Sequence, residues 1–324
     1  MREFDFATAD TVRTALALAG TGSAFLAGGT TLVDLMKLDV LGPAHVIDIN
    51  GLPLTGVTVA DDGLHIGALS RMSDLATDHK VTAAFPMVAQ ALLASASPQL
   101  RNMASIGGNL LQRTRCDYFR DVASACNKRV PGSGCPAQTG VNRAHAILGT
   151  STSCAATHAS DVAVAFVALG ASVRLRSRSG QRTVLLDDFY QLPGTTPDVE
   201  NVLRPGELIT EVVLPPLSWV RTSSYLKVRD RQAYDFALSS VALAVHRKGD
   251  TIADARIAVG GVGTKPWRLP AVEAALQGNP ATEATYQAAA KNAVIGAIPL
   301  SENGFKVTLV QRAIVRALVE LVGA

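Results

Sequence analysis

The segment at residues 23–49, SAFLAGGTTLVDLMKLDVLGPAHVIDI, decides the fold of the first part of this chain. Residues 23–27 form a short apolar run that predicts a strand, and the glycine turn GGTT at residues 28–31 follows it directly. Residues 32–38 place leucine and methionine at helical spacing, and residues 45–49 predict a second buried strand. The order strand, glycine turn, helix, strand indicates a fold in which helices and strands are mixed.

The glycine turn has two interpretations. Glycine has no Cβ, so the backbone N–H groups of Gly28 and Gly29 can approach an anion, and the N-terminus of the following helix adds partial positive charge. The hydroxyls of Thr30 and Thr31 can bond phosphate oxygens. The turn matches neither the G-x-G-x-x-G pattern nor a P-loop with its lysine, so a tight turn with a threonine cap explains it equally well.

Three further motifs are polar. A second glycine pair, Gly107 and Gly108, lies in residues 95–112, which predict a long loop, and it suits either a polar ligand or a plain turn. Asp161 precedes an apolar run and can accept hydrogen bonds from sugar or ribityl hydroxyls, or cap a helix. Lys227 opens a charged stretch that can line a pocket or lie in solvent.

All four cysteines lie in one window with the spacing C-x9-C-x8-C-x18-C: Cys116, Cys126, Cys135 and Cys154. Four thiolates are the ligand set of an iron–sulfur cluster or of a tetrahedral zinc site. Structural zinc sites usually show paired C-x2–4-C ligands, which this window lacks. Two disulfides or four unlinked thiols also fit, so these alternatives stay open.

The cysteine window is rich in basic residues. It contains Asp117 and Asp121 as its only acidic residues near the first three cysteines, against six cations: Arg113, Arg115, Arg120, Lys128, Arg129 and Arg143. A cluster held by four thiolates is anionic, so basic surroundings suit it and are expected to raise its reduction potential.

Composition excludes several classes of protein. The chain has 324 residues, 48% of them hydrophobic and 18% charged, with a net charge of +3 that is too small to indicate nucleic acid or an anionic membrane. The longest apolar stretch, at residues 162–173, is too short to span a bilayer. The start MREFDFATAD lacks an apolar signal region, and a cytosolic folding site disfavours disulfides.

A domain boundary is expected near residues 217–222, after Pro215 and Pro216. Residues 224–229, 239–246 and 255–259 predict a small antiparallel sheet, and helical patterns follow Pro266. The predicted fold class is α+β.

Taken in order, these motifs resemble the flavoprotein subunit of the xanthine dehydrogenase and aldehyde oxidoreductase family. AGGTTL is similar to the first flavin pyrophosphate loop of that family, and ASIGGNL is similar to the second. SDVAVA resembles the family's SD segment, and KVRDRQAYDFALSSVALAV resembles the opening of its C-terminal flavoprotein domain. The resemblance covers essentially the whole chain.

The resemblance implies an FAD-binding domain of two subdomains (the vanillyl-alcohol-oxidase or PCMH type) at residues 1–218, and a C-terminal α+β domain at residues 219–324. It also implies the residues that contact FAD. These are Phe25, Leu26, Ala27, Gly28, Gly29, Thr30, Thr31, Leu32, Ser105, Gly107, Gly108, Asn109, Leu110, Asp161, Ile209 and Lys227.

The cysteine segment is an insertion, at about residues 112–156, that most flavoprotein subunits of this family lack. It is similar to the insertion in periplasmic aldehyde oxidoreductases, whose flavin subunit carries FAD and a [4Fe–4S] cluster. The four cysteines are therefore the expected cluster ligands. A comparable insertion in the flavin subunit of 4-hydroxybenzoyl-CoA reductases makes that enzyme the second candidate.

By the same resemblance, the chain is expected to be an electron-transfer subunit. Its implied partners are a large molybdenum-cofactor subunit and a small subunit with [2Fe–2S] clusters, and its electrons pass to an acceptor protein or to oxygen. The aldehyde is then oxidised on another chain. The rival hypothesis from another class is a zinc-stapled structural subunit without redox work.

The expected compartment depends on the partners. Family resemblance implies a periplasmic location, reached as a folded passenger on a partner that bears a signal. Without such a partner, the missing signal predicts a cytoplasmic location.

Overall fold

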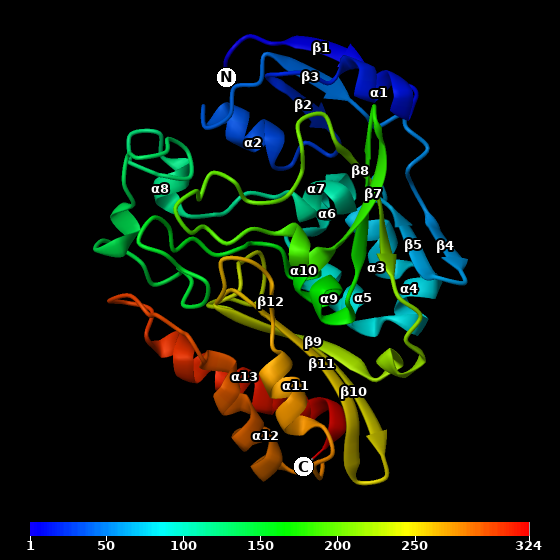
Figure 1. The fold of residues 1–324 in the computed structure, drawn as a ribbon, viewed down its shortest axis with the longest axis vertical. Coiled ribbons are helices and arrows are strands. Elements are labelled where there is room, and N and C mark those ends of the chain that lie inside the picture. Colours follow the sequence, from blue (N-terminus) through cyan, green and yellow to red (C-terminus); the bar gives the residue numbers. More distant parts are fainter. Residues whose placement is uncertain (324) are drawn as a thin grey trace.

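The computed structural model describes residues 1–323 and contains three β-sheets (Figure 1). A three-stranded sheet lies at the N-terminal end, a five-stranded sheet lies in the middle of the molecule, and a four-stranded sheet lies at the C-terminal end. Helices cover the sheets, so the predicted mixed α+β class is confirmed.

The N-terminal sheet is parallel, with strand order β1-β3-β2. Its strands are β1 (Asp5–Thr8), β2 (Ser23–Leu26) and β3 (His45–Asp48). Parallel neighbours require crossover connections, and α1 (Val12–Leu18) and α2 (Leu32–Lys37) provide them. The glycine turn lies between the end of β2 and the start of α2, as its sequence predicts.

The middle sheet is antiparallel, with strand order β4-β5-β8-β6-β7. Its strands are β4 (Val57–Ala60), β5 (Gly63–Gly67), β6 (Ser172–Ser177), β7 (Gly180–Leu185) and β8 (Leu208–Leu214). Strands from residues 57–67, 172–185 and 208–214 therefore meet in one sheet.

Helices pack against the middle sheet in one core with it. The central one is α9 (Asp161–Leu169), whose nine residues are all buried and which ends at Gly170 in the left-handed conformation. The other helices of this core are α3 (Met72–Thr77), α4 (His79–Ala84), α5 (Pro86–Ala94), α7 (Ile106–Leu110) and α10 (Leu186–Phe189). Helix α6 (Pro98–Met103) lies between α5 and α7 in sequence and has no buried residue.

The C-terminal sheet is antiparallel, with strand order β12-β11-β10-β9, as expected for this part of the chain. It contains β9 (Ser223–Val228), β10 (Ser239–Lys248), β11 (Thr251–Gly260) and β12 (Trp267–Arg268). Below it in Figure 1 lie the C-terminal helices: α11 (Pro270–Leu276), α12 (Glu283–Ala290), a 3-10 helix at Lys291–Val294, and α13 (Phe305–Val322).

Strand β10 divides its side chains between two cores because successive residues of a strand face opposite sides. Ala242 and Ala244 join the core that contains α5 and α9. Val241, Leu243 and Val245 join the core that contains α11 to α13. The C-terminal sheet is therefore covered on both faces, and its small residues allow close contact with the first domain.

The cysteine window has little regular structure. It contains only α8 (Asp117–Arg120) and a short 3-10 helix at Pro136–Gln138, and it forms loops at the side of the molecule (Figure 1). Another 3-10 helix, Ser218–Arg221, lies just before β9, near the expected domain boundary. The division at residues 218 and 219 remains a proposal.

One prediction of local structure was wrong. Residues 95–112, expected to be a long loop, contain α6 and α7. The hydroxyl oxygens of Ser97 and Ser105 cap these helices by accepting from the N–H groups of Leu100 and Gly108, each at 3.3 Å. Each helix is only one or two turns long, so hydrophobic periodicity could not reveal it.

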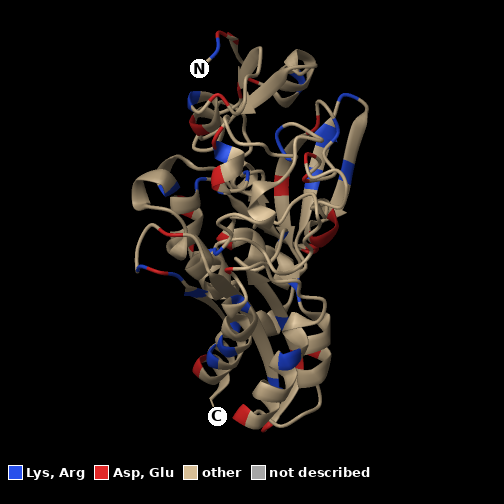
Figure 2. Ribbon diagram, turned by 90° about the vertical axis from the view of Figure 1, so that its left-hand side faces the viewer, with Lys and Arg blue, Asp and Glu red and all other residues tan. Residues whose placement is uncertain are grey.

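Acidic and basic residues are interspersed along the ribbon in Figure 2, which agrees with the small net charge. Among residues 1–323, no helix is long and apolar enough to cross a membrane.

We predict that α13 is essential for the stability of the C-terminal core. Ile314 on this helix is 0% exposed, so Ile314→Ala leaves a cavity and should lower the free energy of unfolding by about 2–5 kcal/mol in urea titrations. Ile295 is 69% exposed, and Ile295→Ala should change it by no more than about 0.5 kcal/mol. Equal losses in the two variants would contradict this assignment of the core.

Candidate functional site

The first glycine turn presents a row of free backbone donors. Within residues 1–323, none of the N–H groups from Ala27 to Thr31 donates a hydrogen bond. Such groups cost free energy unless water or a ligand satisfies them. The turn is therefore suited to accept an anion, whereas a simple capped turn would use its amides internally.

Two glycines are needed at this turn for steric reasons. A Cβ on Gly28 would lie 1.9 Å from the carbonyl oxygen of Met103, and Gly29 has a φ of +72°, which favours glycine. The guanidinium of Arg71 donates to the carbonyl of Met103 and, at 2.8 Å, to Asn50 Oδ1. The Asn50 amide in turn donates to the carbonyl of Ala27 at 3.0 Å, so Arg71 is linked through Asn50 to the first turn. Close packing of the two segments thus fixes the shape of the first turn.

The second glycine turn is built differently. The N–H of Gly107 donates to the carbonyl of Ala68 at 2.8 Å, and the N–H of Gly108 donates to Ser105 Oγ, so these two amides are used within the protein. The Asn109 side chain points to the site, where its Oδ1 accepts from Ser160 Oγ at 2.5 Å. The second turn therefore contributes the Asn109 side chain to the site, and its glycine backbone packs closely against Ala68.

A cavity of about 520 Å³, which we call the large cavity, connects residues from both glycine turns. Four of the predicted cofactor residues line it: Thr30, Asn109, Asp161 and Lys227. Its other walls come from α2, the end of α5, the cysteine window and the loop after β9, and include Asp34, Ser95, Gln112, Arg115, Asp117, Arg120, Arg231, Tyr234, Asp235 and Phe236.

Other predicted residues lie outside the lining of the large cavity. Ile209 is buried in the core of the middle sheet, and Leu110 lines a smaller cavity described below. The remainder belong to the turns themselves or to their flanking elements: Phe25, Leu26, Ala27, Gly28, Gly29, Thr31, Leu32, Ser105, Gly107 and Gly108.

A buried ion pair lies in the wall of the large cavity. Lys227 Nζ donates to Asp161 Oδ2 at 2.8 Å, and the two side chains are 4% and 7% exposed. Asp161 also accepts from Tyr225 OH at 2.7 Å and from Ser95 Oγ at 3.2 Å. Because buried charges are costly unless paired, these contacts fix the Lys227 ammonium at one place.

This geometry changes the expected role of Asp161. Three protein donors already occupy its carboxylate, and Ser160, not Asp161, caps α9 by accepting from the N–H of Ala163 at 3.0 Å. Asp161 therefore acts first as an anchor for Lys227. A carboxylate can accept about four hydrogen bonds, so Asp161 keeps capacity to accept one from a ligand hydroxyl as well.

The four cysteines converge on one small cavity, which we call the cysteine cavity. All four line it and all are free thiols, with Cys126 and Cys154 buried. Burial raises the pKa of Cys116 to about 12 and also raises the pKa of Cys154. A bound cation must therefore displace protons from these thiols.

The cysteine cavity is not preformed for a metal ion. Among residues 1–323, no group of three His, Cys, Asp or Glu side chains is placed to hold one. The whole cavity, which other side chains also line, has a volume of about 10 Å³, close to that needed for one water molecule. The donor set nevertheless fits an iron–sulfur cluster, since four free thiols line one cavity.

Most of the basic residues around the cysteines are paired with carboxylates, contrary to the simple charge argument. Asp34 of α2 accepts from Arg120 at 2.8 Å and from Arg115 at 3.1 Å, and hydrogen bonds from Arg120 lower the pKa of Asp34. Glu200 pairs with Arg113 and with Lys128, the latter at 2.8 Å. Further pairing and carbonyl contacts occupy Arg143 and Arg129.

These pairs neutralise much of the local positive charge. Their main effect is to connect the cysteine window to the rest of the protein, including α2 just after the first glycine turn. The expectation that these basic residues raise the potential of a cluster stays a prediction, and their pairing reduces the charge on which it rests.

A series of adjoining cavities connects the four cysteines to the Asp161–Lys227 pair. Cys116 and His145 line both the cysteine cavity and a neighbouring space of about 250 Å³, which we call the middle cavity. The middle cavity in turn shares Arg115, Asp161 and Phe236 with the large cavity. Cys116 is thus the cysteine nearest in this series to the ion pair.

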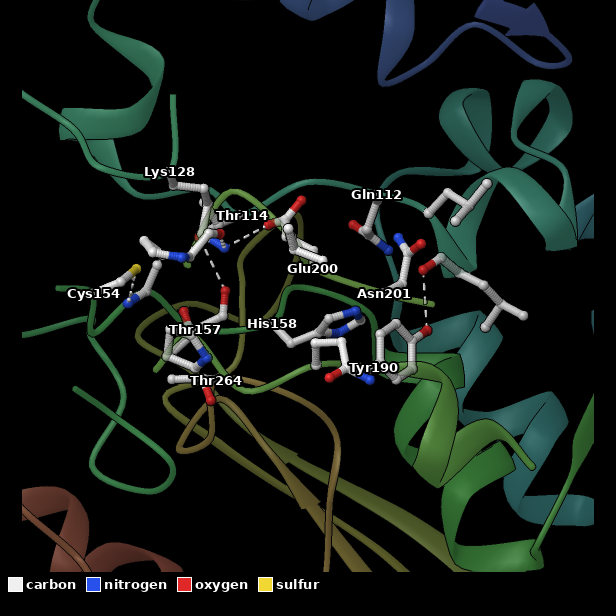
Figure 3. Close-up of a pocket in the computed structure, with 17 residues that line it drawn as sticks. Gln112, Thr114, Lys128, Cys154, Thr157, His158, Tyr190, Glu200, Asn201 and Thr264 are labelled. Carbon is white, nitrogen blue, oxygen red and sulfur yellow. Dashed lines mark hydrogen bonds and ion pairs between the residues drawn. The ribbon is translucent and has the colours of Figure 1, made fainter. Parts of the chain in front are cut away.

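A further small cavity lies on the other side of the cysteines, and Figure 3 shows its lining. Cys154 and Lys128 lie at one end, and Tyr190 lies at the other, where its hydroxyl donates to the carbonyl of Leu110 at 3.0 Å (Figure 3). His158 contacts the Tyr190 ring edge-on at 4.6 Å between centroids, and burial lowers the pKa of His158 to about 3. This wall is therefore neutral apart from its ion pair, Lys128–Glu200.

Sequence reasoning missed several residues of this site. Tyr225 lies two residues before Lys227 on β9, so strand periodicity places both side chains on one face, and this signal was available. Arg71 and His145 come from segments without a motif. Their roles depend on contacts between distant parts of the chain, which no local pattern reveals.

Comparisons with known proteins agree with this arrangement. Residues 2–217 match the family model described as the FAD binding domain in molybdopterin dehydrogenase, and residues 224–321 match the CO dehydrogenase flavoprotein C-terminal domain. The chain is 48% identical over 302 residues to the aldehyde oxidoreductase FAD-binding subunit PaoB of Escherichia coli, covering 92% of this chain and 91% of that protein.

Two more distant relatives extend the comparison. The glyceraldehyde dehydrogenase medium chain of Sulfolobus acidocaldarius is 34% identical over 84% of this chain and 80% of its own. A solved structure of carbon monoxide dehydrogenase from Hydrogenophaga pseudoflava superposes with a TM-score of 0.77 at 27% identity, covering 99% of this chain and 97% of that chain.

We predict that the Asp161–Lys227 pair is energetically sensitive to the loss of one partner. Lys227→Met leaves a buried carboxylate without its cation, so the free energy of unfolding should fall by about 3–5 kcal/mol in urea titrations. Arg2 and Asp39 form an exposed pair at 2.9 Å, and Arg2→Met should cost about 0–1 kcal/mol. A loss at Lys227 no larger than that at Arg2 would contradict the burial described here.

Proposed function

Because the chain belongs to the FAD-binding medium subunits of the molybdenum hydroxylase family, we propose that it carries FAD and a [4Fe–4S] cluster as the electron-transfer subunit of an aldehyde oxidoreductase. Family membership makes it a subunit of an oxidoreductase complex. The cluster, the aldehyde substrate and the electron acceptor are proposals that go beyond family membership.

The observation that carries the proposal is the continuous series of cavities between two chemically distinct ends. One end has free backbone amides and a fixed ammonium, which suit a dinucleotide with a pyrophosphate. The other end has four free cysteines facing one space, which suit an iron–sulfur cluster. A subunit that is only structural has no need for cavities that connect a nucleotide site to four cysteines.

The proposed FAD site uses these groups in distinct ways. The amides from Ala27 to Thr31 would hold the pyrophosphate, with the hydroxyl of Thr30 beside them. Asn109 would contact the ribityl or ribose part across the large cavity. Asp161 would orient Lys227 so that the ammonium lies near the flavin ring, where a positive charge favours the reduced form.

The proposed cluster site uses Cys116, Cys126, Cys135 and Cys154 as its ligands. The support is chemical: four thiols from separate loops line one cavity, none is in a disulfide, and the relative at 48% identity is an aldehyde oxidoreductase subunit. Hydrogen bonds from Arg129 to the carbonyls of Tyr118 and Phe119 brace the loop after Cys116. The protein would thus provide an anchored frame that the cluster completes.

When bound, such a cluster exchanges single electrons and FAD can store two, so the chain would link one-electron delivery to two-electron chemistry. The proposed partners are a large molybdenum subunit, where the aldehyde reacts, and a small [2Fe–2S] subunit. The final acceptor would be a protein or oxygen. A periplasmic location, reached with a signal-bearing partner, is proposed with the aldehyde oxidoreductase assignment.

Two alternatives lead to different observations. A flavin subunit of the 4-hydroxybenzoyl-CoA reductase type would carry the same cofactors but act with a thioester-reducing partner. A zinc-stapled structural subunit would bind stoichiometric zinc and show no redox signal. The resemblance to an aldehyde oxidoreductase subunit over nine tenths of the chain favours the aldehyde oxidoreductase assignment over both alternatives.

For the FAD site, we predict that Gly29→Val greatly lowers flavin occupancy. A branched side chain at a φ of +72° is strained, and its Cβ lies 3.2 Å from Val33 Cγ2, so the turn must change shape. The ratio of the flavin absorbance, at about 450 nm, to the protein absorbance, at about 280 nm, measures the flavin occupancy. Gly20→Ala is the matched control, since no atom lies within 4 Å of the position that its methyl group would take. Full occupancy in a folded Gly29→Val protein would refute this placement.

For the cluster, we predict about four iron and about four sulfide per chain in the intact complex. Cys135→Ala should lower both because one ligand is lost. Val130→Ala, an exposed position in the same loop, should keep both at the wild-type level. Stoichiometric zinc without iron in the wild-type complex would refute the cluster and favour the structural alternative.

A further inference from the structure

The imidazole of His145 contacts a proposed cluster ligand. Its Nε2 lies 3.2 Å from Cys116 Sγ, and His145 itself is only 7% exposed. Within residues 1–323, this is the only side-chain nitrogen that is hydrogen-bonded to a cysteine sulfur. The other ring nitrogen, Nδ1, is buried and has no hydrogen-bond partner in the same part of the chain.

The backbone of His145 is fixed by the C-terminal domain. Its carbonyl accepts from Lys306 Nζ at 3.0 Å and from Asn303 Nδ2 at 3.2 Å. Lys306 is 0% exposed and also donates to the carbonyls of Ala144 and Gly261, at 2.9 and 2.7 Å. Asn303 and Lys306, around the start of α13, therefore hold the backbone at Ala144 and His145 in place. This position directs the imidazole of His145 toward Cys116.

The chemistry of a ligating thiolate determines the direction of this hydrogen bond. A thiolate has no proton and can only accept, so Nε2 must carry the hydrogen when Cys116 binds iron. A hydrogen bond to a ligand sulfur withdraws negative charge from it and stabilises the reduced, more negative cluster. Loss of this donor therefore favours the oxidised form.

We propose that His145 is a positioning residue that raises the reduction potential of the cluster through an Nε2–H donor to Cys116. This inference rests on the proposed function, since it requires the cluster. His145 and Cys116 are also the two residues that line both the cysteine cavity and the middle cavity. The hydrogen bond thus acts at the ligand on the side of the proposed flavin.

The test is a potentiometric titration of the intact complex, with the reduced cluster followed by electron paramagnetic resonance. His145→Phe keeps a ring of similar size but removes the donor, so the midpoint potential should shift to lower values while iron and sulfide stay at the wild-type level. His145→Gln places an amide N–H at the reach of Nε2 and should restore part of the shift. Tyr118→Phe is the control, because Tyr118 lines the same cavity and its hydroxyl accepts from the N–H of Val141 without contacting sulfur.

The outcomes separate this inference from the proposed function. Absence of iron in the wild-type complex refutes the cluster itself. Wild-type iron content in His145→Phe with an unchanged potential overturns the role of His145 and leaves the cluster assignment intact. If His145→Phe loses its iron, His145→Gln and His145→Asn are compared, because the shorter Asn cannot reach the sulfur. Equal potentials in these two variants also overturn the inference.

Discussion

The buried pair of Asp161 and Lys227 is the interaction on which the arrangement of the site depends. Asp161 begins the central helix of the first domain, and Lys227 lies on the first strand of the C-terminal sheet. Their contact fixes the distance between the two domains at the wall of the large cavity. Tyr225 and Ser95 also donate to the carboxylate, so one charged group aligns three segments of the chain: α9, β9 and the residue that follows α5.

Sequence patterns were sufficient for the parts of the fold that are local. The strand, turn and helix around Gly28 and Gly29, and the strands of the C-terminal sheet, follow from apolar runs and glycine positions. The two short helices at residues 98–110 were missed because a helix of one or two turns has no readable period. Their caps, Ser97 and Ser105, were the available signal.

The candidate site was predictable in its residue types and less so in its contacts. The cysteines could be selected because their chemistry is distinctive in any position. Asp161 and Lys227 were selected only through the family resemblance, and their contact with each other was not predicted. His145, Arg71 and the carboxylate partners of the arginines could not be selected, since these depend on residues that are far apart in sequence. The charge argument was incomplete for that reason: the sequence gives the number of cations, whereas the structure also shows which of them are paired with carboxylates.

The ion pairs of Asp34 have a consequence for assembly. Asp34 lies on the helix that follows the first glycine turn, and its partners Arg115 and Arg120 flank Cys116. Ordering either segment therefore lowers the entropy lost when the other becomes ordered. Thermodynamic linkage makes this effect reciprocal, so binding of FAD should favour binding of the proposed cluster, and the reverse. Maturation of the subunit would then be cooperative, and half-loaded chains would be rare.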